Sequence, residues 1–573
     1  MEMKLETSLT DRDRLKKVGL IFSIGLTIFL FWFILLSYVF AFKRLMLLSW
    51  LALKRLIARV ARLFLTLFSR DRKISNSEGS FFVRMHKRIY ARAVVEFFNA
   101  LQIKNSQSGI KLLNFFIEKC KRLDASAQII SSTAGMAISL GENKEALRLL
   151  SILIERYPSD VSAQQQVGVK AFILGKYKLA EIIWTLCSAH REDLIIKLGL
   201  DKLKARFLAP SWYLAIGHIA HLDIYLKHKI LNGHVDHKTY FSLPAGMQLP
   251  NSNLMSYWSD YISTLDKDTL KNLSPNKIGI LQDEFWSIPF EDGKSRMFSH
   301  AGSMVQQRWE AEERTPLLNI KPADRLRGED TLRELGVPAN SWFVCLHVRE
   351  PGFHLKWHKS HPGTRNADIE TYLPAARELV ARGGYVIRLG DSSMRPLTKE
   401  KGIIDYALSK YKSEFMDVFL CGACRFFIGT NSGLGLIPPI FGIPCAMTNW
   451  SPIGLPQWYL KDVYIPKLIF SERLSRNLTF EEMLFSEAGW SQFEKYLVKS
   501  GLQTIDNTPE EITELVLEML DKINGEVTLT DNDQKLRKTF NDLVLRADSY
   551  IGAQLGMGFL RRHQALLATS TTI

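Results

Sequence analysis

The sequence predicts an α/β protein with two Rossmann-like domains, which follow a transmembrane helix and an α-helical repeat region. Three features indicate this organisation. They are an uncharged stretch near the N-terminus, a pattern that recurs after 34 residues, and short apolar segments that alternate with helical ones from about residue 205 onward. Because 573 residues are too many for a single hydrophobic core, several folded units are expected.

The first 75 residues are predicted to form a membrane anchor. Residues 18–42 carry no charge, and 25 such residues are enough to cross a hydrocarbon layer of about 30 Å. The following segment has leucines and arginines at helical spacing, which is typical of a basic amphipathic helix on an anionic membrane. Residues 1–73 hold fourteen Lys or Arg against five Asp or Glu, so the positive-inside rule places the rest of the chain in the cytoplasm. A buried helix of a soluble domain is the alternative.

The strong positive charge does not indicate nucleic-acid binding. Of the net charge of +15, +9 lies in residues 1–73 beside the apolar stretch, and no zinc-finger spacing or RNA-binding aromatic signature is present. The six cysteines are typical of reduced thiols in a cytosolic core. Cys421 and Cys424 form a single CxxC, which favours two packed cysteines on a helix over a zinc site.

Residues 80–200 are predicted to be helical repeats. The stretch LGENKEALRLLSILIERYPSD aligns with LGKYKLAEIIWTLCSAHRED, so that Gly141 matches Gly175 and Ala146 matches Ala180. The glycine ends one helix and the alanine lets two helices approach closely, a pattern that resembles tetratricopeptide repeats. Two roles stay open, a surface that docks a protein partner and a spacer between the membrane and the rest of the chain.

Two α/β domains are predicted, over residues 205–325 and 335–525, with a helical tail at 526–573. Short apolar strands alternating with helices indicate parallel, doubly wound sheets. The predicted strands are SWYLAIG (211–217), HKTYFSL (237–243), WFVCLHV (342–348), YVIRLGD (385–391), RFFIGT (425–430) and PCAMTNW (444–450).

Candidate ligand-binding residues follow the strands of the second domain, because open α/β sheets bind ligands at the carboxyl ends of their strands. They are two arginines, Arg349 and Arg388, a carboxylate, Asp391, and the small residues Thr430, Asn431, Ser432 and Gly433. Guanidinium groups and free backbone N–H groups bind phosphate, and a carboxylate suits a sugar or ribose hydroxyl. Together they predict a nucleotide-diphosphate site, although the small-residue stretch taken alone fits a structural turn equally well.

Several longer motifs resemble one family. VCLHVREPGFH, GGYVIRLGDSSM, FFIGTNSGLGLIPPIFGIPCAMTNWSP and the terminal GMGFLRRHQALL look like a bacterial family of glycosyltransferases found with surface-polysaccharide genes. His347-Val-Arg349 is similar to the His-x-Arg motif of the fucosyltransferase branch, and Thr430–Gly433 to the donor loop of heptosyltransferases. The resemblance implies the two-domain GT-B fold and transfer from a nucleotide sugar, bound by the second domain, to a cell-surface glycan, expected to be lipid-linked. With the anchor, it implies a single-pass protein of the bacterial inner (cytoplasmic) membrane.

The acceptor base is expected in the first domain. His218 and Asp223 lie just after the first predicted strand, and a neutral imidazole can take a proton near pH 7, so His218 is the first candidate and Asp223 the second. Packing in the core is the alternative for both. His354, His358 and His361 follow Arg349 and are expected in a flexible loop over the donor, with a zinc site as the alternative.

No cofactor or metal ion is predicted besides the nucleotide sugar, which is a co-substrate. The Asp-x-Asp pairs at 11–13 and 531–533 are wrongly placed for the metal site of the other glycosyltransferase fold, GT-A. The sequence therefore predicts a membrane-anchored, metal-independent glycosyltransferase. Two alternatives stay open: a non-catalytic scaffold with a degenerate nucleotide-binding domain, and an enzyme that glycosylates proteins held by the repeats.

Overall fold

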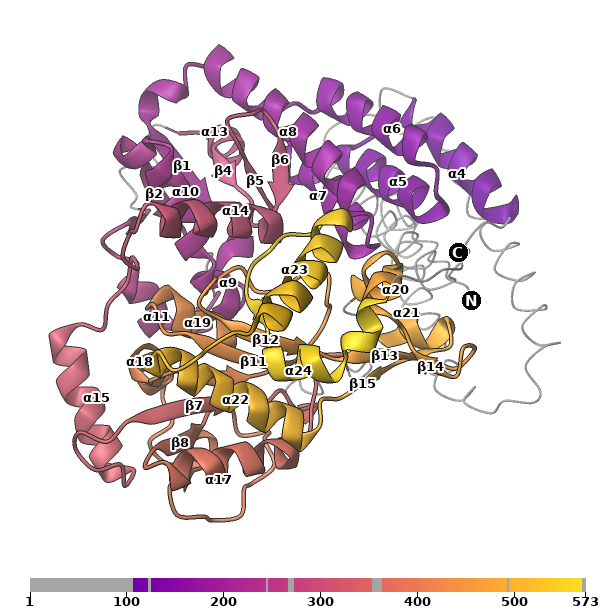
Figure 1. Ribbon diagram of the computed structural model, residues 1–573. Coiled ribbons are helices and arrows are strands. Elements are labelled where there is room, and N and C mark those ends of the chain that lie inside the picture. The colour runs from indigo at the N-terminus through magenta and orange to yellow at the C-terminus, as the bar shows by residue number, and fades with distance from the viewer. Residues whose placement is uncertain are drawn as a thin grey trace, which may run out of the picture. The chain divides into compact units, whose positions relative to one another are not determined.

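The computed structural model describes residues 107–121, 125–243, 246–265, 273–352, 363–491 and 494–568 (Figure 1). All of them belong to the second of the two units of the chain, Ile89–Ile573. They form a helical region (residues 107–203), an N-terminal α/β half (205–311) and a C-terminal α/β half (322–568).

The predicted localisation needs correction. No helix among the described residues is long and apolar enough to cross a membrane, which contradicts the expectation of a single-pass membrane protein. The longest of these helices, α8 (Tyr177–Lys197), is interrupted by charged residues such as Glu181, Arg191 and Asp193. The segment that suggested an anchor, residues 18–42, lies outside the described residues.

The helical region contains the two hairpins that the 34-residue pattern predicts. After α4 (Gln107–Cys120), helices α5 (Ala127–Leu140) and α6 (Asn143–Arg156) form one hairpin, and α7 (Val161–Ile173) and α8 form the other. Gly141 and Gly175 stand at the two turns with φ of 88° and 73°, a left-handed conformation that glycine adopts without strain. Ala146 and Ala180 are fully buried, as the close approach of paired helices requires.

The helical region packs against both α/β halves. The ring of Phe172 lies 6.0 Å from that of Trp286, centroid to centroid, in the N-terminal half. The ring of Tyr177 lies 5.5 Å from that of Trp490 in the C-terminal half, and its hydroxyl donates a 2.8 Å hydrogen bond to the Trp490 carbonyl. These contacts of half-buried aromatic rings join the helical region to both halves.

The N-terminal half is built on a four-stranded parallel sheet in the order β3-β2-β1-β4. The strands are β1 (Ala205–Leu208), β2 (Lys238–Phe241), β3 (Ile262–Thr264) and β4 (Gln282–Asp283), and a hairpin of β5 (Ser287–Pro289) and β6 (Ser295–Met297) follows. The helices are η2 (Pro210–Tyr213), α9 (Ile216–Ala220), α10 (Leu222–Leu231), η3 (His234–Asp236), α11 (Ser252–Tyr257), α13 (Pro275–Ile280) and α14 (Phe298–Ala311).

One predicted strand of this half is wrong. Residues 211–217 form the end of η2 and the start of α9, and the first strand lies earlier, at β1. Pro210 has no backbone N–H to offer a sheet and is suited to the first turn of a helix, so the chain turns there. Trp212 and Tyr213 are buried from a helical turn instead of from a strand, and Leu214, which follows them, is exposed.

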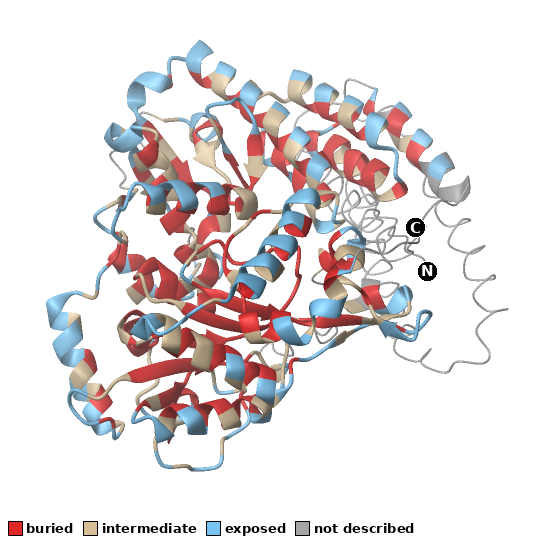
Figure 2. Cartoon of the chain, viewed as in Figure 1, coloured by how far each residue is buried: buried red, intermediate tan, exposed pale blue. Residues whose placement is uncertain are grey.

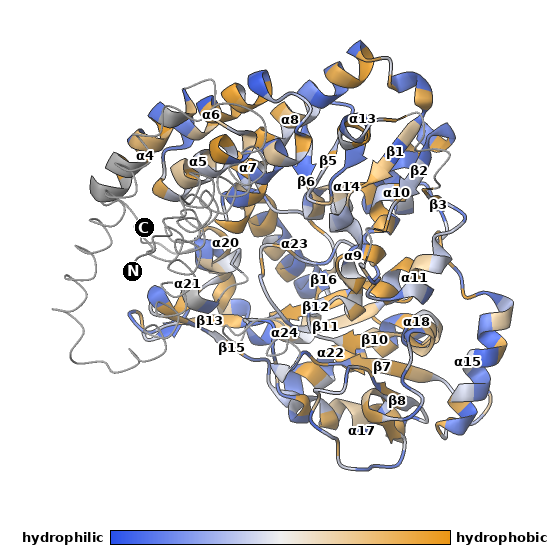
Figure 3. Cartoon of the chain, turned by 180° about the vertical axis from the view of Figure 1, so that it is seen from behind, coloured by the Kyte–Doolittle hydropathy of each residue, from blue (hydrophilic) through white to orange (hydrophobic). Residues whose placement is uncertain are grey.

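The C-terminal half contains a seven-stranded parallel sheet in the order β16-β12-β11-β10-β7-β8-β9. Its strands are β7 (Phe343–His347), β8 (Tyr385–Arg388), β9 (Ile403–Ile404), β10 (Phe427–Gly429), β11 (Cys445–Trp450), β12 (Val463–Pro466) and β16 (Gln554–Leu555). Figures 2 and 3 show that the central strands are buried and apolar, as expected for a sheet covered on both faces. The predicted parallel sheets are therefore confirmed.

The C-terminal half contains a second sheet and a set of helices, of which α17 (Leu373–Ala381) and α22 (Pro509–Asn524) pack on the seven-stranded sheet. A small antiparallel sheet consists of β13 (Leu468–Ser471), β14 (Arg476–Asn477) and β15 (Leu502–Ile505). The helices are α15 (Pro322–Glu334), η4 (Ile369–Tyr372), α17 (Leu373–Ala381), η5 (Tyr406–Leu408), α18 (Glu414–Ala423), η6 (Leu434–Leu436), α19 (Ile437–Ile440), α20 (Phe480–Leu484), η7 (Glu487–Gly489), α21 (Glu494–Lys499), α22 (Pro509–Asn524), α23 (Asp531–Arg546), α24 (Met557–Arg562) and η8 (Gln564–Leu567). The predicted helical tail thus also contributes an edge strand, β16.

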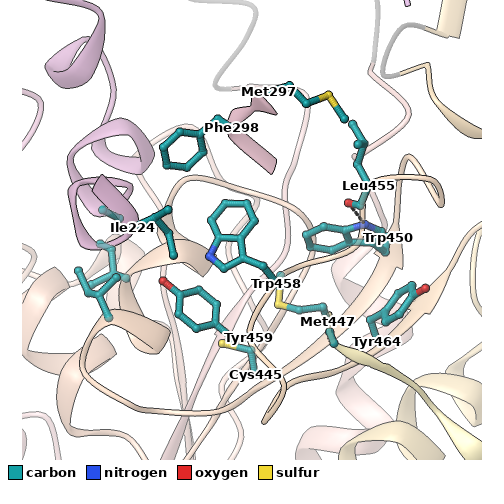
Figure 4. Close-up of a cluster of buried hydrophobic side chains, with 14 of the residues drawn as sticks. Ile224, Met297, Phe298, Cys445, Met447, Trp450, Leu455, Trp458, Tyr459 and Tyr464 are labelled. Carbon is teal, nitrogen blue, oxygen red and sulfur yellow. Dashed lines mark hydrogen bonds between the residues drawn. The ribbon is translucent and has the colours of Figure 1, made fainter. Parts of the chain in front are cut away.

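The hydrophobic core is continuous between the two α/β halves (Figure 4). Phe298 of α14 meets Trp458 of the C-terminal half, with ring centroids 5.8 Å apart, and Tyr459 lies on the other side of Trp458. Apolar packing of this kind fixes the relative position of the two halves, so residues from both can contribute to one site.

Candidate functional site

Each sheet has a point where its strand order reverses, and α/β sheets bind ligands outside such points. In the C-terminal sheet, chain connections leave β7 for β8 on one side and reach β10 on the other. In the N-terminal sheet the same reversal falls between β1 and β4. The residues just after β7 and β10, and just after β1 and β4, are therefore the ones whose contacts matter most.

We call the carboxyl ends of β7 and β10, with the residues that follow them, the β7–β10 crevice, and use the name β1–β4 crevice in the same sense. The ends of β7 and β10 are joined by hydrogen bonds. The Thr430 backbone N–H donates to the His347 carbonyl (3.1 Å), and the Arg349 N–H donates to Thr430 Oγ1 (2.9 Å). Gly429 allows this approach, because a Cβ there would lie 2.4 Å from the His347 carbonyl oxygen. The predicted site residues of β7 and β10 are thus brought together, and Thr430 serves as a bridge whose hydroxyl already accepts a hydrogen bond.

The small-residue stretch after β10 forms a turn that contacts the other half. Ser432 Oγ accepts from the Gly435 N–H (3.2 Å), and Asn431 Nδ2 donates to the Ser451 carbonyl (3.1 Å). The turn leads into η6 and the four-residue helix α19, so little helix dipole is available at this point. A Cβ at Gly217 would lie 2.9 Å from the Gly433 Cα, which places this turn directly against the start of α9.

Two arginines at the β7–β10 crevice have no carboxylate partner in the part of the chain that the structure describes. No described Asp or Glu forms an ion pair with Arg349 or Arg365, although both side chains are largely buried. Burial, reinforced by the charge of Arg365, lowers the pKa of Arg349 to about 9. Arg349 Nε is buried and bonded to no described residue. Two like charges held together without a counter-ion indicate a site for an anion.

Other buried polar groups that follow the strands of this sheet also lack partners among the described residues. Both side-chain atoms of Asn366 and the Ser393 hydroxyl are buried and bonded to no described residue. The segment is held in place, because the Ala367 N–H donates to the Arg349 carbonyl (3.1 Å). Since buried polar atoms in folded proteins are nearly always hydrogen-bonded, this cluster has unused capacity for a polar ligand.

Arg388 has a different environment from the predicted one. Its side chain is fully buried, Nη2 lies 2.7 Å from Glu350 Oε1, and Nη1 lies 2.9 Å from Asp405 Oδ1. Both terminal nitrogens are thus occupied by carboxylates, and the guanidinium has no charge to spare for a phosphate. We assign Arg388 to the support of the β8 end, and Arg365 is instead the second arginine without a carboxylate partner among the described residues.

His347 and Asp391 lie at the same edge. His347 Nδ1 lies 3.2 Å from the Leu389 carbonyl and donates to it, which leaves Nε2 as an acceptor. Burial and the neighbouring arginines lower the pKa of His347 to about 4, so it is neutral near pH 7. Asp391 Oδ1 accepts from the Ser393 N–H (2.7 Å) and shapes the turn after β8. His347 thus suits a hydroxyl donor better than a phosphate.

The β1–β4 crevice of the N-terminal half joins His218 to a carboxylate. His218 Nδ1 lies 2.6 Å from the Ser211 carbonyl, and Ser211 Oγ donates to Glu284 Oε2 (2.9 Å). The imidazole ring stacks on Phe285, with centroids 4.2 Å apart. Burial lowers the pKa of His218 and raises that of Glu284. His218 is therefore a neutral imidazole whose Nε2 carries a lone pair.

Asp223, the second candidate base, lies in a buried ion pair. It is fully buried, Oδ2 lies 2.7 Å from Lys227 Nζ, and Oδ2 also accepts from the Tyr459 hydroxyl (3.1 Å). These contacts tie α10 to the C-terminal half and leave Asp223 no route to an acceptor hydroxyl, so we correct its predicted role to a structural one.

Arg365 and Glu284 were not predicted from the sequence. Arg365 lies in a polar loop without regular structure, and Glu284 follows a strand of two residues, too short to produce a periodic signal. The three histidines at 354–361 lie outside the described residues. No group of three or more His, Cys, Asp or Glu that could hold a metal ion occurs within the part of the chain that the structure describes. There, Cys421 and Cys424 are buried free thiols, as predicted.

No protein-family model and no curated protein matches the chain, so the resemblance to tetratricopeptide repeats stays a prediction. Solved structures do match. The ADP-heptose LPS heptosyltransferase II of E. coli shares 13% identity, covers 56% of this chain and 99% of its own, and has a TM-score of 0.34. A glycosyltransferase of family 9 from Veillonella parvula shares 10% over 42% of this chain and 79% of its own, with a TM-score of 0.28.

A third similar structure is TibC, an iron-containing dodecameric glycosyltransferase of enterotoxigenic E. coli. It shares 13% identity over 56% of this chain and 77% of its own, with a TM-score of 0.29. All three are glycosyltransferases, the enzyme class that the sequence motifs indicate.

Proposed function

We propose that this chain is a glycosyltransferase that moves a sugar from a nucleotide-diphosphate donor to a hydroxyl group of a cell-surface glycan. The donor diphosphate binds at the β7–β10 crevice, and the acceptor binds opposite it, at the β1–β4 crevice. The observation that carries the proposal is the pair of largely buried arginines, Arg349 and Arg365, without a carboxylate partner among the described residues.

A diphosphate satisfies this site in both charge and hydrogen bonding. Guanidinium groups bind phosphate oxygens through two parallel N–H donors, and such charge-assisted bonds are about twice as strong as neutral ones. The departing nucleotide diphosphate gains negative charge as the glycosidic bond to the donor breaks, so preorganised cations in a partly buried site stabilise the transition state more than the ground state. Two arginines can supply this stabilisation without a metal ion.

His218 is proposed as the acceptor base. The Ser211 carbonyl holds the proton on Nδ1, so Nε2 is free to accept the proton of an acceptor hydroxyl. The acceptor oxygen then bonds to the anomeric carbon of the sugar while the bond between that carbon and the diphosphate oxygen breaks. The close contact of Gly217 with Gly433 sets His218, the next residue, beside the turn after β10.

Nucleotide binding tests the proposal directly. We expect the full chain to bind one of UDP, GDP or ADP in calorimetry and to bind the matching monophosphate more weakly. Arg349→Gln and Arg365→Gln should each lower the affinity for the diphosphate at least tenfold, since a hydrogen bond to a charged group contributes about 1.5–3 kcal/mol. Arg382→Gln is the matched control, because Arg382 is exposed on the same half.

Two results would contradict the proposal. If no nucleoside diphosphate binds, or if the two arginine variants bind as tightly as the control, the crevice is not a diphosphate site. If the diphosphate binds but no nucleotide sugar of that base releases its sugar with any acceptor, the chain is a nucleotide-binding scaffold.

A further inference from the structure

Glu284 occupies the position in the N-terminal sheet that Thr430 occupies in the C-terminal sheet. It directly follows β4, and Ser211 follows β1, so the two residues flank the point where the strand order reverses. Ser211 joins the groups on this edge: its hydroxyl donates to Glu284 Oε2 (2.9 Å) and its carbonyl accepts from His218 Nδ1 (2.6 Å). A ligand in this crevice would meet Glu284 and His218 together.

The Glu284 carboxylate has little to balance it. Arg191, whose charge acts on Glu284, is bonded to other groups: Nη1 lies 3.0 Å from Asp283 Oδ1 and 2.7 Å from the Gln282 carbonyl, and Nη2 lies 3.4 Å from Glu192 Oε1. The second oxygen, Oε1, accepts no hydrogen bond from the described residues and is not sealed from solvent. Desolvation raises the pKa of Glu284, and a hydroxylated ligand would supply the donors that the carboxylate lacks.

Among the described residues, the two crevices differ in the charge that they offer to a ligand. The described residues that follow the four strands of the N-terminal sheet are 209–215, 242–243, 246–251, 265 and 284–290, and Glu284 is the only charged residue among them. The C-terminal crevice carries Arg349 and Arg365, and no described carboxylate forms an ion pair with either of them. A phosphate or carboxylate on the acceptor would be repelled by Glu284 and would find no cation among the described residues that follow these strands, whereas uncharged hydroxyl groups would be accepted.

We infer that Glu284 is an acceptor-binding residue. The sugar residue of the acceptor whose hydroxyl group receives the new sugar is uncharged. Adjacent hydroxyl groups of a sugar ring can donate to both oxygens of one carboxylate, which a serine or threonine side chain cannot do. The inference rests on the proposed function and adds the acceptor class to it.

Acceptor charge provides the test. The full chain is supplied with a nucleotide sugar of the base that it binds, and nucleotide release is measured with a panel of methyl hexosides and with the corresponding hexose 6-phosphates. We expect the neutral glycosides to react at least tenfold faster. Glu284→Gln keeps the acceptor oxygen for Ser211, and it should lower the rate with neutral glycosides about tenfold and reduce their advantage over the phosphates. Glu291→Gln, at an exposed carboxylate of the same half, is the control.

The outcomes separate this inference from the proposed function. Nucleotide-diphosphate affinity should stay within twofold of wild type in Glu284→Gln, which shows that the variant is folded and that the donor site is intact. Equal rates with neutral and phosphorylated sugars, an unchanged preference in Glu284→Gln, or no transfer to any neutral glycoside by a chain that binds the donor would each overturn the inference and leave the donor site standing. Absence of nucleotide binding by the wild type would instead refute the proposed function.

Discussion

Replacing Arg388 with methionine should destabilise the protein without removing its nucleotide site. The guanidinium is fully buried and neutralises Glu350 and Asp405, which are themselves only 13% and 20% exposed. Their remaining oxygens accept backbone N–H groups, from Arg395 (2.9 Å) and Leu397 (3.0 Å), so both carboxylates are fixed in place. Removing one partner of a buried ion pair costs about 3–5 kcal/mol, because an uncompensated charge remains.

Urea unfolding followed by circular dichroism measures this loss, and calorimetry measures diphosphate affinity well below the unfolding midpoint. The variant in which Arg388→Met is combined with Glu350→Gln and Asp405→Asn lacks the stranded charges and should regain most of the stability. Arg382→Met, at an exposed site, is the control. If Arg388→Met were as stable as the wild type but lost the diphosphate, Arg388 would be a ligand-binding residue and our assignment would be refuted.

Two further predictions concern stability. Burial raises the pKa of Asp462 to about 8, so the wild type loses stability as the pH rises from the unfolded value near 4 through 8, whereas Asp462→Asn does not. At about 1.4 kcal/mol per pH unit, the advantage of Asp462→Asn in urea unfolding should grow by about 4 kcal/mol between pH 5 and pH 8, and a constant difference would contradict this. Gly217→Ala should cost about 1–3 kcal/mol, because its Cβ would lie 2.9 Å from the Gly433 Cα and 3.1 Å from Leu436 Cδ1. Gly279→Ala, which has open space around it, should cost nothing, and equal behaviour of the two alanine variants would show that the contact is relaxed.

The strands of the C-terminal half could be predicted because each is a short apolar run between turn residues. The rule that ligands bind at carboxyl ends then brought His347, Arg349 and Thr430 together correctly, since it depends only on strand direction. Pairing between side chains does not follow from such a rule. The sequence did not reveal the ion pairs of Arg388, because the two carboxylates that it contacts come from other loops, 38 and 17 residues away. Arg388 was therefore predicted to bind a phosphate.

The parts of the site that sequence patterns missed depend on tertiary contacts. Asp223 looks like a base in the sequence because it follows a histidine on a helix, but Lys227 one turn later and Tyr459 from the other half make it part of the core. Arg365 has no carboxylate partner among the described residues. A sequence pattern does not show which arginines lack an ion-pair partner in the folded chain. Glu284 can be recognised as a candidate site residue only from the pairing of β4 with β1, which places it beside Ser211.

The helical region illustrates how an experiment can mislead when a module is cut from its setting. Phe172, Tyr177 and the edge of α8 are covered by Trp286, Trp490 and the β5–β6 hairpin in the intact chain. If these helices were expressed alone, they would expose to a cell extract an apolar surface that the intact chain covers. Proteins captured by the isolated helices would bind this exposed apolar surface nonspecifically. A search for physiological binding partners should therefore use the intact chain.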